Sequence, residues 1–110
     1  MENISFAEFQ KMDIRVGEIR KAEDIPGADK LYKVIVDIGG EERTMVAGIK
    51  LHYKKEELPG KKVLVLVNLE PKSIRGVESH GMILCAHSKD RSQLVCTTVE
   101  KDIAVGSKVS

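Results

Sequence analysis

The polar side chains that could do chemistry gather in one segment, residues 68–82. It contains two cations, Lys72 and Arg75, and two neutral hydrogen-bonding side chains, Asn68 and Ser79. Lys and Arg bind phosphate oxygens, and the planar Arg group can also stack on a flat ring. Asn and Ser supply neutral donors and acceptors. These residue types favour a surface that binds an anion.

The distribution of charge agrees with such a surface. The net charge is only +1, but residues 1–49 carry seven Lys or Arg against ten Asp or Glu, which gives −3. Residues 50–75 carry seven against three, which gives +4, and residues 76–110 carry four of each. A polyanion would be attracted to the middle of the chain with salt-sensitive affinity. The alternative is a lysine-rich face that is merely solvated.

Catalytic patterns are absent from the sequence. It contains no G-x-G-x-x-G, P-loop, H-E-x-x-H or G-x-S-x-G motif. The histidines, His52, His80 and His87, are scattered, and Ser79 and His80 are neighbours whose side chains would point apart in a strand. We therefore expect no enzyme activity, no catalytic residue and no cofactor.

The two cysteines, Cys85 and Cys96, lie in apolar, strand-like surroundings. Reduced thiols in a cytoplasmic protein are the expected state, and a cross-strand disulfide is the alternative. A zinc site needs four ligands, and Cys85, His87 and Cys96 lack paired ligand spacing, so no metal is expected. No apolar run approaches the roughly 20 residues that span a bilayer, and no secretory signal is evident, so we expect no membrane association.

The first element is a short helix over residues 5–12. Ser5 and Glu8 form a capping-box pattern, and Phe6, Phe9 and Met12 share one face. A helix this short is unstable alone. It must pack against one end of its own domain or against a second subunit.

Alternating apolar residues predict a series of short strands. We expect them over residues 13–25, 30–38, 41–47, 61–69, 81–87 and 93–99, with an edge strand in the tail 102–109. The apolar parity shifts across Gly17, which predicts a β-bulge. Residues 50–58 read as a short helix or irregular connection, and residues 70–79 as a polar loop. The order favours an all-β fold, an OB-fold five-stranded Greek-key barrel with an N-terminal helix and a C-terminal extension.

The segment 68–82 also resembles the signature of a known family. Its sequence, Asn-Leu-Glu-Pro-Lys-Ser-Ile-Arg-Gly-Val-Glu-Ser-His-Gly-Met, is similar to that of the tRNA-binding domain of methionyl-tRNA synthetase C-terminal regions and free-standing homologues. Residues 13–17, residues 28–32, Arg43 and residues 47–49 match further landmarks in order. The resemblance covers essentially the whole chain.

The resemblance implies an OB-fold that recognises tRNA by shape and backbone. The residues expected to bind tRNA are Lys30, Asn68, Lys72, Arg75, Ser79 and Met82. Gly81 would allow close backbone approach, and Met82 would offer an adaptable apolar contact to a base. Two alternatives stay open: Asn68 could only bond the loop backbone, and Met82 could belong to the core.

The resemblance also suggests how the chain is organised. Residues 1–110 would form a single domain, with residues 1–12 and 100–110 contributing to a homodimer. The partner protein would be a methionyl-tRNA synthetase catalytic chain, for which this chain would act as the beta subunit. The alternative is a homodimeric chaperone-like protein that binds unfolded or export-bound polypeptides.

Overall fold

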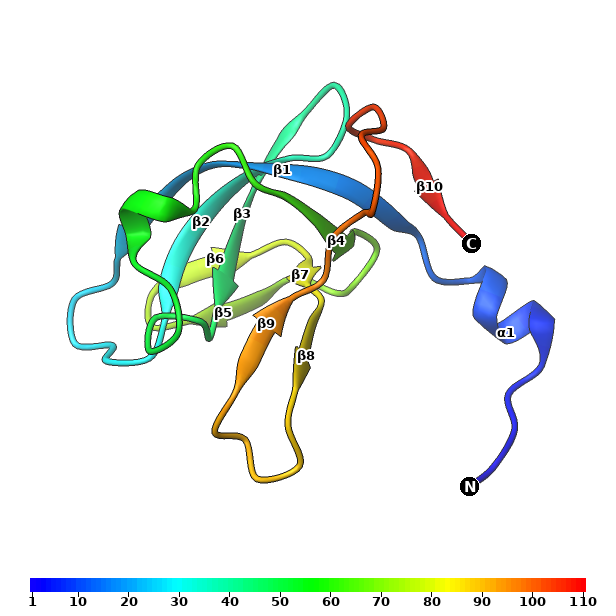
Figure 1. Cartoon of the computed structure of the whole chain (residues 1–110), viewed down its shortest axis with the longest axis horizontal. Helices are drawn as coiled ribbons and strands as arrows, with labels where there is room; N and C mark the ends of the chain where they lie inside the picture. Colours follow the sequence, from blue (N-terminus) through cyan, green and yellow to red (C-terminus); the bar gives the residue numbers. More distant parts are fainter.

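The computed structural model describes all residues 1–110 and is built mainly of β-strands (Figure 1). Helix α1 spans Phe6–Gln10, and a 3-10 helix, η1, spans Lys55–Glu57. The strands are β1 (Ile14–Asp24), β2 (Tyr32–Asp37), β3 (Glu42–Ala47), β4 (Lys62–Leu66), β5 (Lys72–Ile74), β6 (Val77–Ser79), β7 (Met82–Ile83), β8 (Cys85–His87), β9 (Leu94–Cys96) and β10 (Lys108–Val109).

The main sheet is antiparallel, in the order β3-β2-β1-β4-β7. Strand β10 pairs with the start of β1, so the predicted edge strand in the tail is confirmed. Two hairpins, β5–β6 and β8–β9, lie outside this ladder. The prediction of a polar loop over residues 70–79 was wrong, because cross-strand pairing turns most of that segment into the β5–β6 hairpin.

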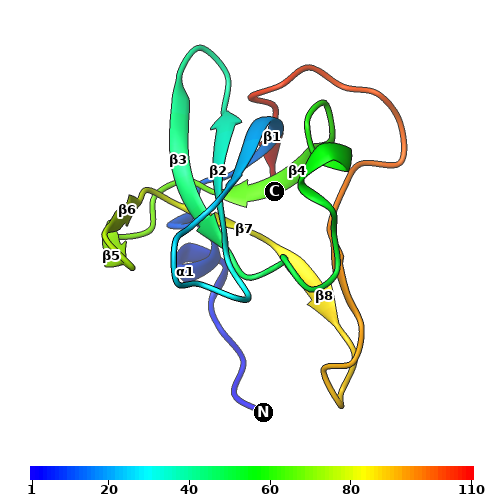
Figure 2. The same ribbon diagram turned by 90° about the vertical axis from the view of Figure 1, so that its left-hand side faces the viewer.

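The sheet bends until its two edges nearly meet (Figure 2). The His80 N–H donates to the Thr44 carbonyl at 2.8 Å, and the Val46 N–H donates to the Ser79 hydroxyl at 2.9 Å. These bonds join β3 to the last residue of β6 and to His80, which follows it. The predicted OB-like barrel is therefore confirmed as a nearly closed, barrel-like sheet.

The long strand β1 bends so that it can serve both halves of the sheet. The expected bulge is present, but the register with β2 shifts between Ile19 and Lys21 and not at Gly17. Gly17 has a different function. A Cβ there would lie 2.8 Å from Val36 Cγ1 and 3.3 Å from Val65 Cγ2, so β1 approaches its neighbours too closely for a side chain.

The core lies inside the barrel and is entirely aliphatic apart from Tyr32 and Met45. Its members are Ile19, Tyr32, Val34, Val36, Ile38, Met45, Ala47, Ile49, Leu58, Val63, Val65, Val67 and Ile83. The predicted alternation of β2 is confirmed, because Tyr32, Val34, Val36 and Ile38 are all buried.

Helix α1 projects away from the barrel (Figure 1). Its capping box is confirmed: the Glu8 N–H donates to the Ser5 hydroxyl at 3.1 Å, and the Ser5 N–H donates to the Glu8 carboxylate at 3.3 Å. Phe6 is 71% exposed and no helix residue is buried, so packing on the end of its own barrel was wrong. The helix instead lies beside the tail, where Lys108 Nζ donates to the Met12 carbonyl at 2.9 Å.

No helix of the chain has both the length and the apolar character needed to cross a membrane.

Candidate nucleic-acid interface

The predicted site is built around the β5–β6 hairpin. Lys72 pairs with Ser79 and Ile74 pairs with Val77, which leaves a two-residue turn made by Arg75 and Gly76. Both turn residues have positive φ, 52° and 80°, as a type I′ hairpin turn requires. The turn leaves the Arg75 side chain exposed at the tip of the hairpin.

One side of the hairpin forms the Met82 hollow, an open depression of about 260 Å³. Its wall brings together three of the predicted site residues, Lys72, Ser79 and Met82, with Glu70 beside them. Met82 is 42% exposed, so it does not belong to the core. An exposed cation and an exposed apolar thioether thus share this surface, and the buried Ser79 borders it.

The tip of the hairpin faces a second depression, the Arg75 hollow, of about 380 Å³. Residues 27–31 form its other wall, which includes Lys30 and Asp29. Lys30 and Arg75 are far apart in sequence, yet the fold brings them to the same depression. Neither side chain makes an ion pair with a carboxylate.

The Asn68 side chain is engaged by the backbone of the N-terminal segment. Its Oδ1 accepts from the Asp13 N–H at 2.8 Å, and its Nδ2 donates to the Lys11 carbonyl at 2.6 Å. These two bonds fix the chain between α1 and β1 to the end of β4. Asn68 thus bonds backbone, but that of the N-terminal segment and not that of its own loop, as the alternative had expected. An RNA contact of Asn68 stays a prediction.

Ser79 and Gly81 lie at the seam where the barrel closes. The Ser79 side chain is buried, at 6% exposed, and its hydroxyl donates to the Gly81 carbonyl at 3.3 Å while accepting from Val46. Gly81 has a φ of +118°, and a Cβ there would lie 2.9 Å from the Leu66 carbonyl oxygen. The seam explains the small hydroxyl residue at position 79 and the glycine at position 81.

Ion pairs neutralise part of the basic middle segment. Lys50 and Lys55 both pair with Asp24, at 3.2 and 2.6 Å, and the hydrogen bond from Lys55, followed by that from Lys50, lowers the pKa of this carboxyl. Lys62 pairs with Asp102 at 2.6 Å. The excess of positive charge is thus less free than the sequence suggests. Lys72 and Arg75 are among the basic residues that keep unpaired side chains.

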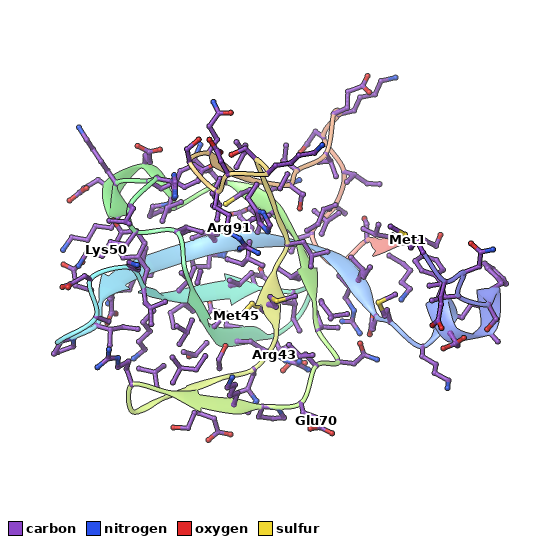
Figure 3. The ribbon with its side chains drawn as sticks, turned by 90° about the horizontal axis from the view of Figure 1, so that it is seen from below. Met1, Arg43, Met45, Lys50, Glu70 and Arg91 are labelled. Atoms are coloured by element: carbon purple, nitrogen blue, oxygen red, sulfur yellow. The ribbon has the colours of Figure 1, made fainter.

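A polar depression between β3 and the β5–β6 hairpin was not predicted from the sequence. This hollow of about 560 Å³ is lined by Lys33, Arg43, Glu78 and His80 among others. Arg43 donates to the Val67 carbonyl at 2.5 Å and pairs with Glu41 at 3.5 Å, so it is tied to the barrel. Figure 3 shows Arg43 between β3 and the β5–β6 hairpin, with Met45 inside the barrel. Arg43 matches a family landmark, and this match was the sequence feature that pointed to the depression.

A second missed feature is an apolar groove of about 370 Å³, on the other side of Met82. Its lining comprises Val46, Ala47, Gly48, Ile49, Met82, Ile83, Leu84, Cys85, His87 and Leu94. Val46 and Met82 border both the groove and the Met82 hollow, so the two surfaces are continuous. The signal was the parity of Val46, an apolar residue between the inward-facing Met45 and Ala47.

The structure offers no cluster of three or more His, Cys, Asp or Glu side chains that could hold a metal ion. Among the predicted site residues, the cations Lys30, Lys72 and Arg75 and the apolar Met82 are exposed and make up the candidate interface. Such a surface can bind phosphates and contact an unstacked base.

Known proteins match this chain over nearly its full length. A methionine–tRNA ligase of Pyrococcus furiosus is 50% identical over 109 residues, which are 99% of this chain and 15% of the ligase. The chain thus spans a small fraction of the ligase that it matches.

Solved structures agree with the fold. The MetRS-related protein of Pyrococcus horikoshii superimposes with a TM-score of 0.93 at 44% identity, with all of both chains covered. The CsaA chaperone protein of Picrophilus torridus superimposes with a TM-score of 0.87 at 32% identity, covering 98% of this chain and all of that one.

The family comparison covers the same elements that build the barrel and its seam. The model of the family described as "Putative tRNA binding domain" matches residues 14–108, from the start of β1 into β10. It contains the β5–β6 hairpin, both hollows and the closing bonds of β3. The chain therefore belongs to this tRNA-binding domain family.

Proposed function

We propose that this chain is a non-catalytic module that binds tRNA by shape and backbone. The observation that carries the proposal is the position of Lys30, Lys72 and Arg75, three exposed cations without ion pairs, at or beside one hairpin. Met82 supplies an adjacent apolar contact, 42% exposed. The chain has only four aromatic residues, too few for a long stacking platform, which favours recognition of phosphates and shape.

The partner that we propose is a methionyl-tRNA synthetase catalytic chain, to which this protein would bring added affinity for tRNA as a beta subunit. Its similarity to a segment of methionine–tRNA ligases supports this assignment. Such a module needs no catalytic residues of its own. Its site of action would be the cytoplasm, where aminoacylation takes place.

We further propose a homodimer formed by helix α1 and the tail. Phe6, Phe9 and Met12 border a hollow of about 190 Å³ with Lys108 and Val109, and a second copy could bury these apolar groups. In a homodimer the two tRNA-binding sites could contact one large RNA together, and avidity would raise the overall affinity.

Phe9→Asp should give monomers by light scattering. A well-folded dimer of this variant would refute the contact.

The central test compares two double variants in a binding titration with labelled tRNA. Lys72→Ala with Arg75→Ala removes two cations from the interface and should weaken binding by at least about tenfold at physiological salt. The matched control is Lys89→Ala with Arg91→Ala, which removes the same charge from the tip of the β8–β9 hairpin. This control should bind tRNA almost as the wild type does.

Equal losses in the two double variants would mean that only net charge matters, and the proposed interface would be wrong. A single-stranded RNA of equal length and charge serves as a second ligand. Recognition of shape requires that tRNA bind more tightly than this unfolded competitor.

Binding of unfolded or export-bound polypeptide is the second candidate function. The apolar groove beside Met82 favours it, as does the similarity to the Picrophilus torridus CsaA chaperone protein. Leu94→Glu would place a charge in the groove and should abolish capture of an unfolded polypeptide while tRNA binding persists. If the wild type captured the unfolded polypeptide and did not bind tRNA, this function would replace the first proposal.

A further inference from the structure

The two cysteines face each other across the β8–β9 hairpin. Cys85 is the register partner of Cys96, and their sulfur atoms are 3.8 Å apart, with both thiols free. The hydrogen bonds of the hairpin lie on either side of this pair: Thr97 N–H donates to the Leu84 carbonyl at 3.0 Å, and Ser88 N–H to the Gln93 carbonyl at 3.0 Å.

Hydrogen-bonded and non-hydrogen-bonded pairs alternate along an antiparallel hairpin, so Cys85 and Cys96, next to the bonded pair Leu84 and Thr97, are a non-hydrogen-bonded pair. The Cys96 N–H accordingly turns outward, to the Tyr53 hydroxyl at 3.0 Å. In such pairs the Cα atoms are about 4.5 Å apart, within the span of about 4.4–6.8 Å that a disulfide bridges. The backbone therefore already has a geometry suited to a bond between the two sulfurs.

We propose that Cys85 and Cys96 form a reversible disulfide within one chain when the protein meets a hydroperoxide. The Cys96 thiolate attacks one peroxide oxygen, the O–O bond breaks, and the leaving oxygen takes a proton to become water or an alcohol. Cys96 is then a sulfenic acid. The Cys85 sulfur attacks the Cys96 sulfur, and hydroxide leaves with the Cys85 proton as water. Two thiols are oxidised by two electrons, and one peroxide is reduced.

The surroundings divide the two roles between the cysteines. The hydrogen bond from the Cys85 thiol is the main cause that lowers the pKa of Cys96 to about 7. Burial raises this pKa, whereas the Tyr53 hydroxyl and the charge of Lys61 lower it further. The same hydrogen bond, followed by burial, raises the pKa of Cys85. Cys96 is therefore the nucleophile, and Cys85 resolves the sulfenic acid.

The bond would change a wall of the apolar groove, because Cys85 lines it together with Met82 and Leu94. It would also join β8 to β9 covalently, next to β7. Opening of the hairpin would become harder, and the groove would gain a fixed edge in place of a thiol.

The test treats the wild-type chain with excess hydrogen peroxide and maps its peptides. Trypsin cleaves after Lys89 and Arg91, between the two cysteines, so a disulfide is required to hold the two cysteine peptides together. We expect one linked pair, a mass lower by two hydrogen atoms, and full reversal by dithiothreitol. Melting in the oxidised state should shift upward by several degrees.

Two variants assign the roles. Cys85→Ser should stop at a Cys96 sulfenic acid that dimedone traps, whereas Cys96→Ser should react with peroxide at least tenfold more slowly. Three results would overturn the proposal: both thiols still open to alkylation after peroxide, a bond only between two chains, or Cys96 overoxidised while Cys85 stays free. The wild-type map decides the matter even if a variant fails to fold.

Discussion

The two hairpins outside the main sheet have similar tips and different surroundings. Each hairpin carries one lysine and one arginine, and in each the arginine lies at the tip with positive φ, 52° at Arg75 and 62° at Arg91. At the β8–β9 tip the Asp90 carboxylate accepts from the Ser92 N–H at 3.0 Å and the Ser88 hydroxyl at 2.8 Å. The β5–β6 turn, Arg75-Gly76, has no carboxylate.

The surroundings differ as much as the tips. The β5–β6 hairpin is attached to β3 through Ser79, so its cations lie against hollows in the barrel wall. The β8–β9 hairpin extends away from the barrel (Figure 1), and Lys89 and Arg91 at its tip are exposed and make no ion pair. Similar turn residues can therefore lie against the barrel wall or at a solvated tip. The attachment to the barrel decides which.

The largest expected effect comes from breaking that attachment at Gly81. Gly81→Ala would strain a backbone at φ +118° and place Cβ 2.9 Å from the Leu66 carbonyl oxygen, which cannot move aside. We expect a loss of about 3 kcal/mol in the free energy of unfolding, measured in urea. Gly76→Ala is the control, since its φ is +80° but no atom lies within 4 Å. Equal losses would show that strain alone matters at the seam.

A smaller loss is expected from Ser79→Ala. The substitution leaves the Val46 N–H without its acceptor at the closing seam, which should cost about 1–3 kcal/mol in urea unfolding. Ser73→Ala, an exposed change in the same hairpin, should cost less than about 0.5 kcal/mol. If Ser79→Ala were as mild as Ser73→Ala, the hairpin would not depend on β3 for its position.

The next effect concerns tRNA binding and compares the two arginines directly. Arg75→Ala should weaken tRNA binding about three- to tenfold. The slope of log binding constant against log salt concentration should become shallower by the amount that one phosphate contact contributes, about one. Arg91→Ala should change neither the affinity nor the slope, because Arg91 is exposed and borders none of the hollows described above. An equal response of the two variants in a salt titration would remove the distinction between the hairpins.

The smallest effect is a titration at the β8–β9 tip. Hydrogen bonds, first that from the Ser92 N–H and then that from the Ser88 hydroxyl, lower the pKa of Asp90 from its ordinary 3.8 to about 2. Because the folded-state pKa is depressed, the contribution of these bonds is present above pH 3.8 and lost as the pH falls through 2. The Ser92 amide shift in an NMR titration should have a midpoint near 2. An ordinary midpoint would mean that the tip is open in solution.

The sequence predicted the barrel well because its signals are local. The alternation in β2, the capping box of α1 and the tail strand each depend on residues close together in the chain. The bulge was predicted at Gly17 because the alternation of apolar residues shifts there. That shift looks the same whether the glycine marks a bulge or only a close approach of neighbouring strands. Residues 70–79 were predicted to be a loop because three-residue strands around a two-residue turn give almost no periodic signal.

Sequence alone therefore determined the family and the residue types of the candidate interface, because the order and spacing of motifs can be recognised without knowledge of contacts. Only the tertiary structure decided which motif side chains stay free. Asn68 and Ser79 are engaged by backbone from residues 57 and 33 positions away, whereas Lys72, Arg75 and Met82 stay exposed. Burial and hydrogen bonding depend on which distant segments meet, and the closure of the barrel, more than any local pattern, brings them together.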